Sequence, residues 1–67
     1  MSTSTARTVD DLVTEVTDAP TPRQARAIMA SVRSRNALEA MADQLYIEYV
    51  GVGSDTLRAA IVAEARA

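Results

Sequence analysis

The chain lacks cysteine, histidine and lysine, and its 67 residues include only two glycines, two prolines and two aromatic side chains. Without cysteine it can form neither a disulfide nor a thiolate metal site. Without histidine it lacks the commonest general base and metal ligand, and it cannot build a Ser-His or Cys-His nucleophile. These absences predict a chain that is not an enzyme and that has no metal site and no cofactor.

Long apolar runs are also absent, since no stretch approaches the roughly 20 residues that a membrane-spanning helix needs. The polar start, MSTSTARTVDD, has no apolar segment of the kind that a signal peptide requires. We therefore expect no membrane association and a cytoplasmic location. A chain of this size makes one domain at most, near the lower limit for a stable core. We expect a disordered Ser/Thr-rich tail over residues 1–7 and one domain over residues 8–67, with oligomerisation adding stability.

Charge is unevenly distributed along a chain whose net charge is −2 and whose isoelectric point is near 4.8. Residues 1–20 contain one arginine against four acids, and residues 37–67 contain two against five. Residues 21–36 contain no acid and four arginines, which are Arg23, Arg26, Arg33 and Arg35. Three interpretations fit this group: a solvated helix face, a contact with an acidic protein surface, or a contact with nucleic-acid phosphates. Because nucleic-acid-binding domains usually have isoelectric points above about 9, a protein partner is favoured over DNA.

Four helical runs are predicted, and the first two have clear start signals. Thr8 followed by Asp11 has the spacing of a capping box. The sequence DAPTP ends this first run, because proline has no backbone N–H and restricts the residue before it. In the second run Thr21 serves as the cap, with Pro22 at the first helical position and Gln24 at the third.

The third run is expected to begin near Asn36, with Glu39 at the capping-box spacing. Whether residues 22–46 form one bent helix or two stays open, although the poor helix formers in RSRN favour a break. The fourth run is expected to begin with Ser54 or Asp55 as its cap.

Apolar residues spaced i, i+3, i+4, i+7 give each run one face for a shared core. The predicted core residues are Val9, Leu12, Val13, Val16, Ala25, Ile28, Met29, Val32, Leu38, Met41, Ala42, Leu45, Leu57, Ala60, Ile61 and Ala65. Val62 points away from this face of the last run, so we expect it at the surface. There it adjoins the small side chains of Ala59 and Ala63, which together make a plausible self-association surface. The pattern predicts a small all-α bundle of about four short helices.

The stretch YIEYVGVGSDTL breaks the helical rhythm and contains a G-x-G. It does not predict a phosphate-binding loop, because the chain has no lysine and no third glycine at the spacing that nucleotide-binding loops use. Its β-rich residues have no second strand with which to pair. We therefore expect an extended elbow between two helices, with Ile47 tucked under them and Tyr49 capping the core.

Residues 37–64 resemble the helix–extended-loop–helix families, namely the HeH/LEM-like, SAP-like and Rho N-terminal-like domains. The matching positions are Leu38, Ala42, Leu45, Ile47, Leu57 and Ile61. The resemblance implies a helix–extended-loop–helix unit at the carboxyl end of the domain. Tyr46 stands where these families usually have a glycine, and the basic residues that SAP-like domains use on DNA are mostly absent. The families also include protein-binding members, and small phage proteins often carry such modules.

These observations predict a small, acidic protein-interaction module, namely a phage-type accessory or regulatory protein found in the host cytoplasm or the virion. Its expected partner is another protein, and it is expected to associate with itself. The alternative is a weak DNA-binding protein that uses an arginine-rich helix face. The candidate partner-binding residues are Arg23, Arg26, Arg33, Arg35, Tyr46, Tyr49 and Val62.

Overall fold

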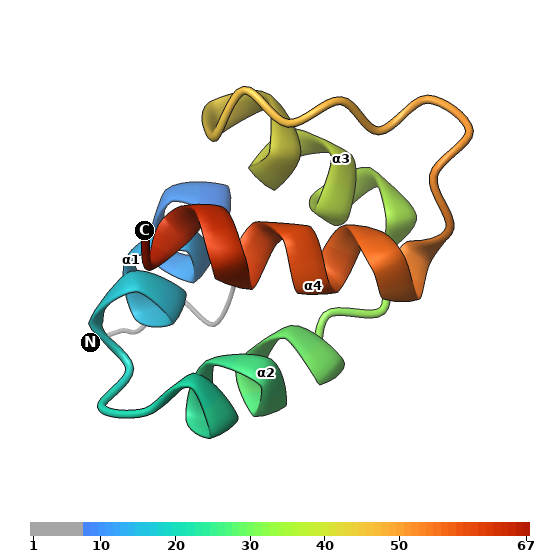
Figure 1. Ribbon diagram of the computed structural model, residues 1–67. Helices are drawn as coiled ribbons and strands as arrows, with labels where there is room; N and C mark the ends of the chain where they lie inside the picture. Colours follow the sequence, from blue (N-terminus) through green and yellow to red (C-terminus); the bar gives the residue numbers. More distant parts are fainter. Residues whose placement is uncertain (1–7) are drawn as a thin grey trace.

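Four α-helices and their connections make up residues 8–67, which are the residues that the computed structural model describes (Figure 1). In chain order the helices are α1 (Val9–Asp18), α2 (Pro22–Ala30), α3 (Arg35–Gln44) and α4 (Ser54–Ala65). No β-strand occurs within residues 8–67, and the prediction of a small all-α bundle ending in a helix–loop–helix unit is confirmed. The tail predicted over residues 1–7 lies outside the described residues.

The first two helices begin where the sequence predicts. The Thr8 hydroxyl accepts a hydrogen bond from the Asp11 amide at 3.1 Å, and the Thr8 amide donates to the Asp11 carboxylate at 3.3 Å. The Thr21 hydroxyl accepts from the Gln24 amide at 3.2 Å, with Pro22 at the first helical position. Each side-chain cap satisfies an amide that has no partner inside its helix and is worth about 1 kcal/mol.

The third helix begins earlier than predicted. Its cap is Ser34, whose hydroxyl accepts from the Ala37 amide at 3.3 Å, so Asn36 already lies inside the helix. Starting at Arg35 places that residue four positions before Glu39, and the two side chains form an ion pair at 3.0 Å. The four residues before Arg35 are not helical, so α2 and α3 are two separate helices.

The fourth helix also has a different cap from the one predicted. Gly53 occupies the capping position and offers no side chain, while Ser54 and Asp55 form the first helical turn. Both of these side chains bind arginines instead. The Ser54 hydroxyl accepts from Arg35 at 3.3 Å, and the Asp55 carboxylate pairs with Arg58 at 2.9 Å. A distant arginine therefore takes the Ser54 hydroxyl, and an arginine of the next helical turn takes the Asp55 carboxylate.

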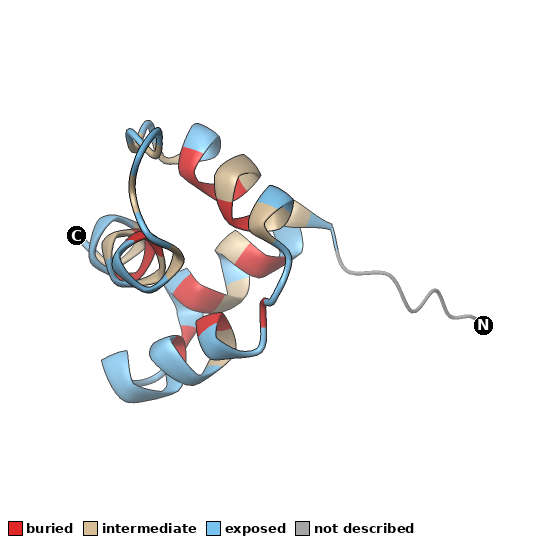
Figure 2. Cartoon of the chain, turned by 90° about the vertical axis from the view of Figure 1, so that its right-hand side faces the viewer, coloured by how far each residue is buried: buried red, intermediate tan, exposed pale blue. Residues whose placement is uncertain are grey.

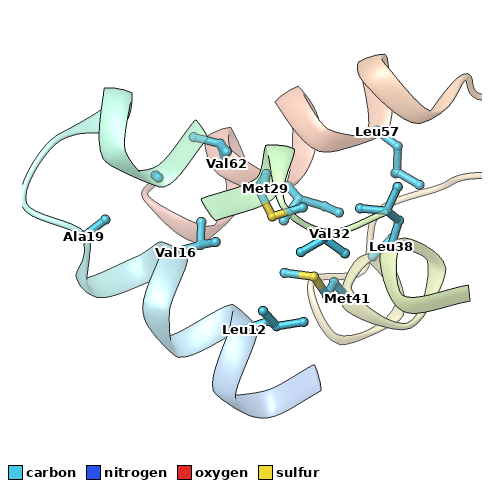
Figure 3. Close-up of a cluster of buried hydrophobic side chains, with 12 residues drawn as sticks. Leu12, Val16, Ala19, Met29, Val32, Leu38, Met41, Leu57 and Val62 are labelled. Carbon is cyan, nitrogen blue, oxygen red and sulfur yellow. The ribbon is translucent and has the colours of Figure 1, made fainter. Parts of the chain in front are cut away.

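Helix α4 runs between α2 and α3, which do not contact each other (Figure 1). Each of the four helices contributes buried residues (Figure 2), and their side chains form one apolar cluster (Figure 3). Its members are Leu12, Val16, Ala19, Ala25, Met29, Val32, Leu38, Met41, Ala42, Leu57, Ile61 and Val62. The surface position predicted for Val62 is wrong, because its side chain is only 8% exposed. Because α4 packs against α2 on one side and α3 on the other, it buries side chains beyond the single apolar stripe that its sequence spacing predicts.

Candidate functional site

The end of α3 has an uncommon residue in a common backbone arrangement. The Tyr46 amide donates to the Asp43 carbonyl at 3.2 Å, and the Ile47 amide donates to the Ala42 carbonyl at 2.8 Å. This pair of bonds is the Schellman motif, which requires a left-handed residue just beyond the helix. Glycine usually takes that place, but here Tyr46 does, with a φ of 58°. Tyr46 is the one non-glycine residue with positive φ within residues 8–67.

The connection over residues 45–53 divides its apolar side chains between core and solvent. Ile47 and Tyr49 are partly buried and pack against the core, in agreement with the predicted elbow. Tyr46 and Val50 point outward, and they are 96% and 84% exposed. The buried members hold the loop in place, so the two exposed ones are displayed on an anchored segment.

These residues line a shallow depression at the end of α3, which we call the aromatic loop surface. Its members are Asp43, Tyr46, Ile47, Glu48, Tyr49 and Val50. The carboxylates of Asp43 and Glu48 make no ion pair with any arginine of residues 8–67. The charge of Asp43, followed by partial desolvation and the charge of Glu39, raises the pKa of the Tyr49 hydroxyl above its ordinary value. The surface therefore combines exposed aromatic and aliphatic groups with uncompensated negative charge.

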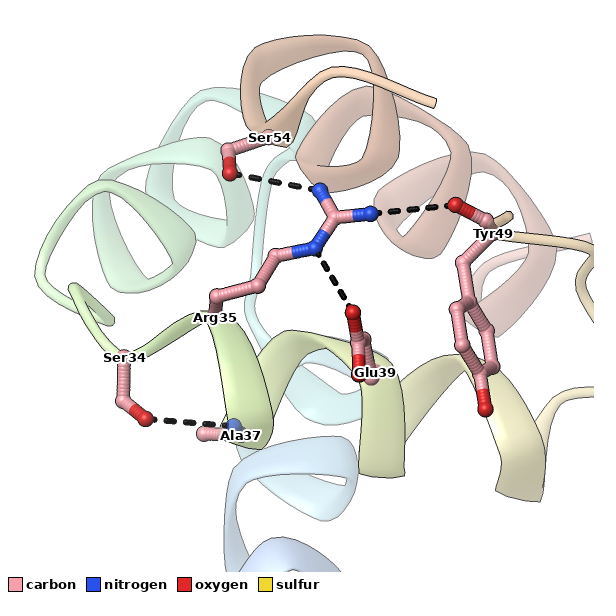
Figure 4. Close-up of polar contacts among 6 residues, drawn as sticks. All are labelled: Ser34, Arg35, Ala37, Glu39, Tyr49 and Ser54. Carbon is pink, nitrogen blue, oxygen red and sulfur yellow. Dashed lines mark hydrogen bonds and ion pairs between the residues drawn. The ribbon is translucent and has the colours of Figure 1, made fainter. Parts of the chain in front are cut away.

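Arg35, a candidate partner-binding residue, is occupied inside the molecule (Figure 4). Its guanidinium donates to the Glu39 carboxylate at 3.0 Å, to the Tyr49 carbonyl at 3.0 Å and to the Ser54 hydroxyl at 3.3 Å. One side chain thus joins α3, the loop and the start of α4. The structure gives Arg35 the role of fixing the aromatic loop surface to the bundle.

The other three arginines predicted to bind a partner are free. Arg23, Arg26 and Arg33 are exposed, and none makes a hydrogen bond or ion pair within residues 8–67. Arg23 and Arg26 lie one turn apart on α2, whereas Arg33 lies in the non-helical connection to α3. Arg33 therefore does not share the helix face on which it was expected beside Arg23 and Arg26. We call Arg23, Arg26 and Arg33 the arginine group.

Two further arginines have structural roles that sequence reasoning missed. Arg66 donates to the carbonyls of Val16 at 3.1 Å and Ala19 at 2.7 Å. In a continuing helix the Val16 carbonyl would accept from residue 20, but Pro20 has no N–H. The sequence shows this missing donor, because it shows Pro20, but it does not show that Arg66 supplies the hydrogen bond instead. Arg58 similarly donates to the Val32 carbonyl at 3.0 Å.

Val62 was also a candidate for partner binding, and it lies along a narrow groove between α2 and α4. The groove holds about 140 Å³ and its surface is mostly apolar. Arg26 and Arg58 are among its other lining residues. Val62 therefore belongs mainly to the core and contributes little accessible surface to this groove.

No protein-family model, curated protein or solved structure matches this chain. Within residues 8–67, no group of three or more acidic side chains is placed to hold a metal ion. The helices of the same residues all fall short of the length and apolar content needed to cross a membrane. The aromatic loop surface and the arginine group are thus the two candidate functional features.

Proposed function

We propose that this chain is a non-enzymatic protein-interaction module whose binding site is the aromatic loop surface. The observation that carries the proposal is the conformation and exposure of Tyr46. A left-handed backbone costs a non-glycine residue roughly 1–2 kcal/mol. Buried contacts do not offset this cost, because the ring is 96% exposed. The fold needs a left-handed residue at this position but does not need a tyrosine. Strained non-glycine residues are typical of functional positions, and tyrosine is enriched at protein interfaces.

The surroundings of Tyr46 indicate how such an interface would work. Val50 adds a second exposed apolar side chain, while Asp43 and Glu48 supply negative charge that no arginine of residues 8–67 pairs with. An apolar centre with charged groups at its edge is the usual composition of a protein-binding patch. Arg35 holds the loop to α3 and α4, which reduces the entropy that binding would otherwise cost.

The resemblance of residues 37–64 to helix–extended-loop–helix domains, which include protein-binding members, supports the same role. On that ground we assign the chain an accessory or regulatory role of the phage type, in the host cytoplasm or the virion. The absence of histidine and cysteine supports a role without catalysis.

A selection from a random-peptide display library tests protein binding. The immobilised chain should enrich a defined set of peptides, and these should bind the Thr14→Ala variant equally, because Thr14 is exposed on α1. The same peptides should lose binding to Tyr46→Gly, which keeps the backbone conformation but removes the ring. Equal binding to Tyr46→Gly, or no enrichment on the wild-type chain, would contradict the proposal.

The second candidate function is weak DNA binding through the arginine group. It is favoured by one observation, namely that all three guanidinium groups are exposed and have no ion-pair partner within residues 8–67. Neutralising three phosphates would make the affinity fall roughly 40-fold between about 50 and 200 mM salt. Fluorescence anisotropy with labelled duplex DNA measures this dependence. Binding that shows this loss and disappears in Arg23→Ala/Arg26→Ala/Arg33→Ala would establish the DNA-binding function instead.

A further inference from the structure

The aromatic loop surface has the chemistry that an arginine side chain binds. Guanidinium groups stack on the faces of tyrosine rings and form ion pairs with carboxylates. Tyr46 offers an exposed ring, and Asp43 and Glu48 offer two carboxylates that pair with no arginine of residues 8–67. A segment that carries several exposed arginines is therefore the partner of matching chemistry.

This chain itself carries such a segment. The arginine group places three unpaired positive charges on α2 and on the connection that follows it. Most residues of helix α2 are exposed, and most of its ribbon is pale blue in Figure 2. Its arginines carry no acid nearby in sequence, since residues 21–36 contain none.

Two members of the arginine group, Arg23 and Arg26, lie on α2 and away from the loop surface of the same molecule (Figure 1). Helix α2 and the loop after α3 lie at opposite sides of α4, and both views place α2 at the bottom and the loop at the top (Figures 1 and 2). No Cα atom of α2 lies within 8 Å of a Cα atom of α3. A pairing of Arg23 and Arg26 with the loop surface is therefore between different molecules.

We infer that copies of this chain associate head to tail, with the arginine group of one copy bound to the aromatic loop surface of the next. The inference rests on the proposed function, because the same loop surface is the binding site in both. Two different surfaces joined in this way make a heterologous contact, which continues into open chains or closes into a ring. Because the contact depends on exposed charges, it weakens as salt is added.

Complementation between two variants tests this arrangement directly. Arg23→Gln/Arg26→Gln/Arg33→Gln removes the arginine group but keeps the loop surface. Asp43→Asn/Tyr46→Gly/Glu48→Gln removes the loop surface but keeps the arginine group. All six positions are exposed, so both variants should fold, and circular dichroism checks that they do.

Light scattering at low salt gives the readout. The wild-type chain should show a mass that rises with concentration and returns to the 7.2 kDa of one chain when salt is added. Each variant alone should stay at 7.2 kDa, and an equimolar mixture should form a 1:1 dimer and nothing larger. A dimer is the limit because each variant retains one working surface.

A control variant separates this contact from a general effect of charge. Asp10→Asn/Asp18→Asn removes two exposed acids from α1, the same number that the loop variant loses, and should leave association intact. Loss of association in this control would place the acidic surface on α1 and overturn the inference. A mixture of the loop and arginine variants that stays monomeric would overturn it as well.

The outcomes also separate this inference from the proposed function. A wild-type chain that is monomeric at all concentrations, yet selects peptides that depend on Tyr46, overturns head-to-tail association and leaves the interaction module in place. If the chain selects no peptides and also stays monomeric, both are overturned. Salt-sensitive DNA binding by the arginine group in a monomeric chain would assign that group to nucleic acid.

Discussion

Replacing Tyr46 with glycine should make the protein more stable, although the change removes a large side chain. Tyr46 has a φ of 58°, a conformation that costs a residue with a Cβ atom roughly 1–2 kcal/mol. Glycine adopts it freely, but its flexibility in the unfolded chain costs roughly 0.5–1 kcal/mol. Losing the ring removes little packing, since it is 96% exposed. The net gain is about 0.5–1 kcal/mol, which raises Tm by roughly 2–8 °C for a domain of this size.

Thermal unfolding followed by circular dichroism measures this difference, and two variants serve as controls. Tyr46→Ala keeps the Cβ atom and its strain, so its free energy of unfolding should stay within about 0.5 kcal/mol of the wild type. Glu48→Gly adds glycine at an exposed loop position without positive φ, and should lower the free energy of unfolding by about 0.4–1 kcal/mol. A lower Tm for Tyr46→Gly would show that the ring stabilises the folded chain, and would remove the main argument for a binding role.

Three further predictions concern the core, the loop anchor and a titrating group. Val62→Ala should lower the free energy of unfolding, measured in urea titrations, by about 1.5–2 kcal/mol. The matched change Val50→Ala, at an 84% exposed position, should alter it by under about 0.5 kcal/mol. Equal effects would contradict the burial of Val62. Arg35→Ala should lower the free energy of unfolding by about 1–2 kcal/mol. Arg35→Lys should lower it by less than Arg35→Ala but not restore the wild-type value, because a lysine cannot donate in the three fixed directions of a guanidinium. A wild-type value for Arg35→Lys in urea titrations would show that charge alone matters. The raised pKa of Tyr49 favours the protonated ring in the folded state, so this stabilisation is present below pH about 10 and is lost as the pH rises through the folded-state pKa. Asp43→Asn should move that pKa down toward its ordinary value in an NMR titration of the Tyr49 ring, and an unchanged pKa would show that Asp43 is not the main cause.

Features that depend on neighbouring residues were predictable from the sequence. The caps of α1 and α2 were correctly placed because each involves two residues three positions apart, Thr8 with Asp11 and Thr21 with Gln24. The all-α class and most of the core also follow from helical spacing. The predicted elbow uses one of the two glycines for a left-handed turn, since Gly51 has a φ of 77° within the connecting loop.

Features that depend on distant residues were not predictable. Ser54 and Asp55 were suitable caps by local rules, but arginines from elsewhere in the chain and from the next turn bind them instead. Val62 is buried because α4 has neighbours on both sides, which a single helical stripe cannot reveal.

The candidate site was predicted in part. Tyr46 and the three free arginines were named from the sequence and are exposed, as a binding role requires, whereas Arg35 has internal partners. The sequence does not show this difference, because all four arginines lie in the same acid-free segment. Their partners remain predictions for the experiments above.

The contact between Arg66 and the end of α1 also determines when this chain can fold during its synthesis. It joins positions 50 residues apart, between the first helix and the end of the last. Pro20 leaves the Val16 carbonyl at the end of α1 without an amide donor. Until residue 66 leaves the ribosome, this carbonyl also lacks its hydrogen bond from Arg66. The surfaces of α2 and α3 that α4 covers are likewise open to chaperones until then. We therefore expect the folding force on stalled nascent chains to rise only after α4 has emerged, and an earlier rise would show that the first three helices fold without it.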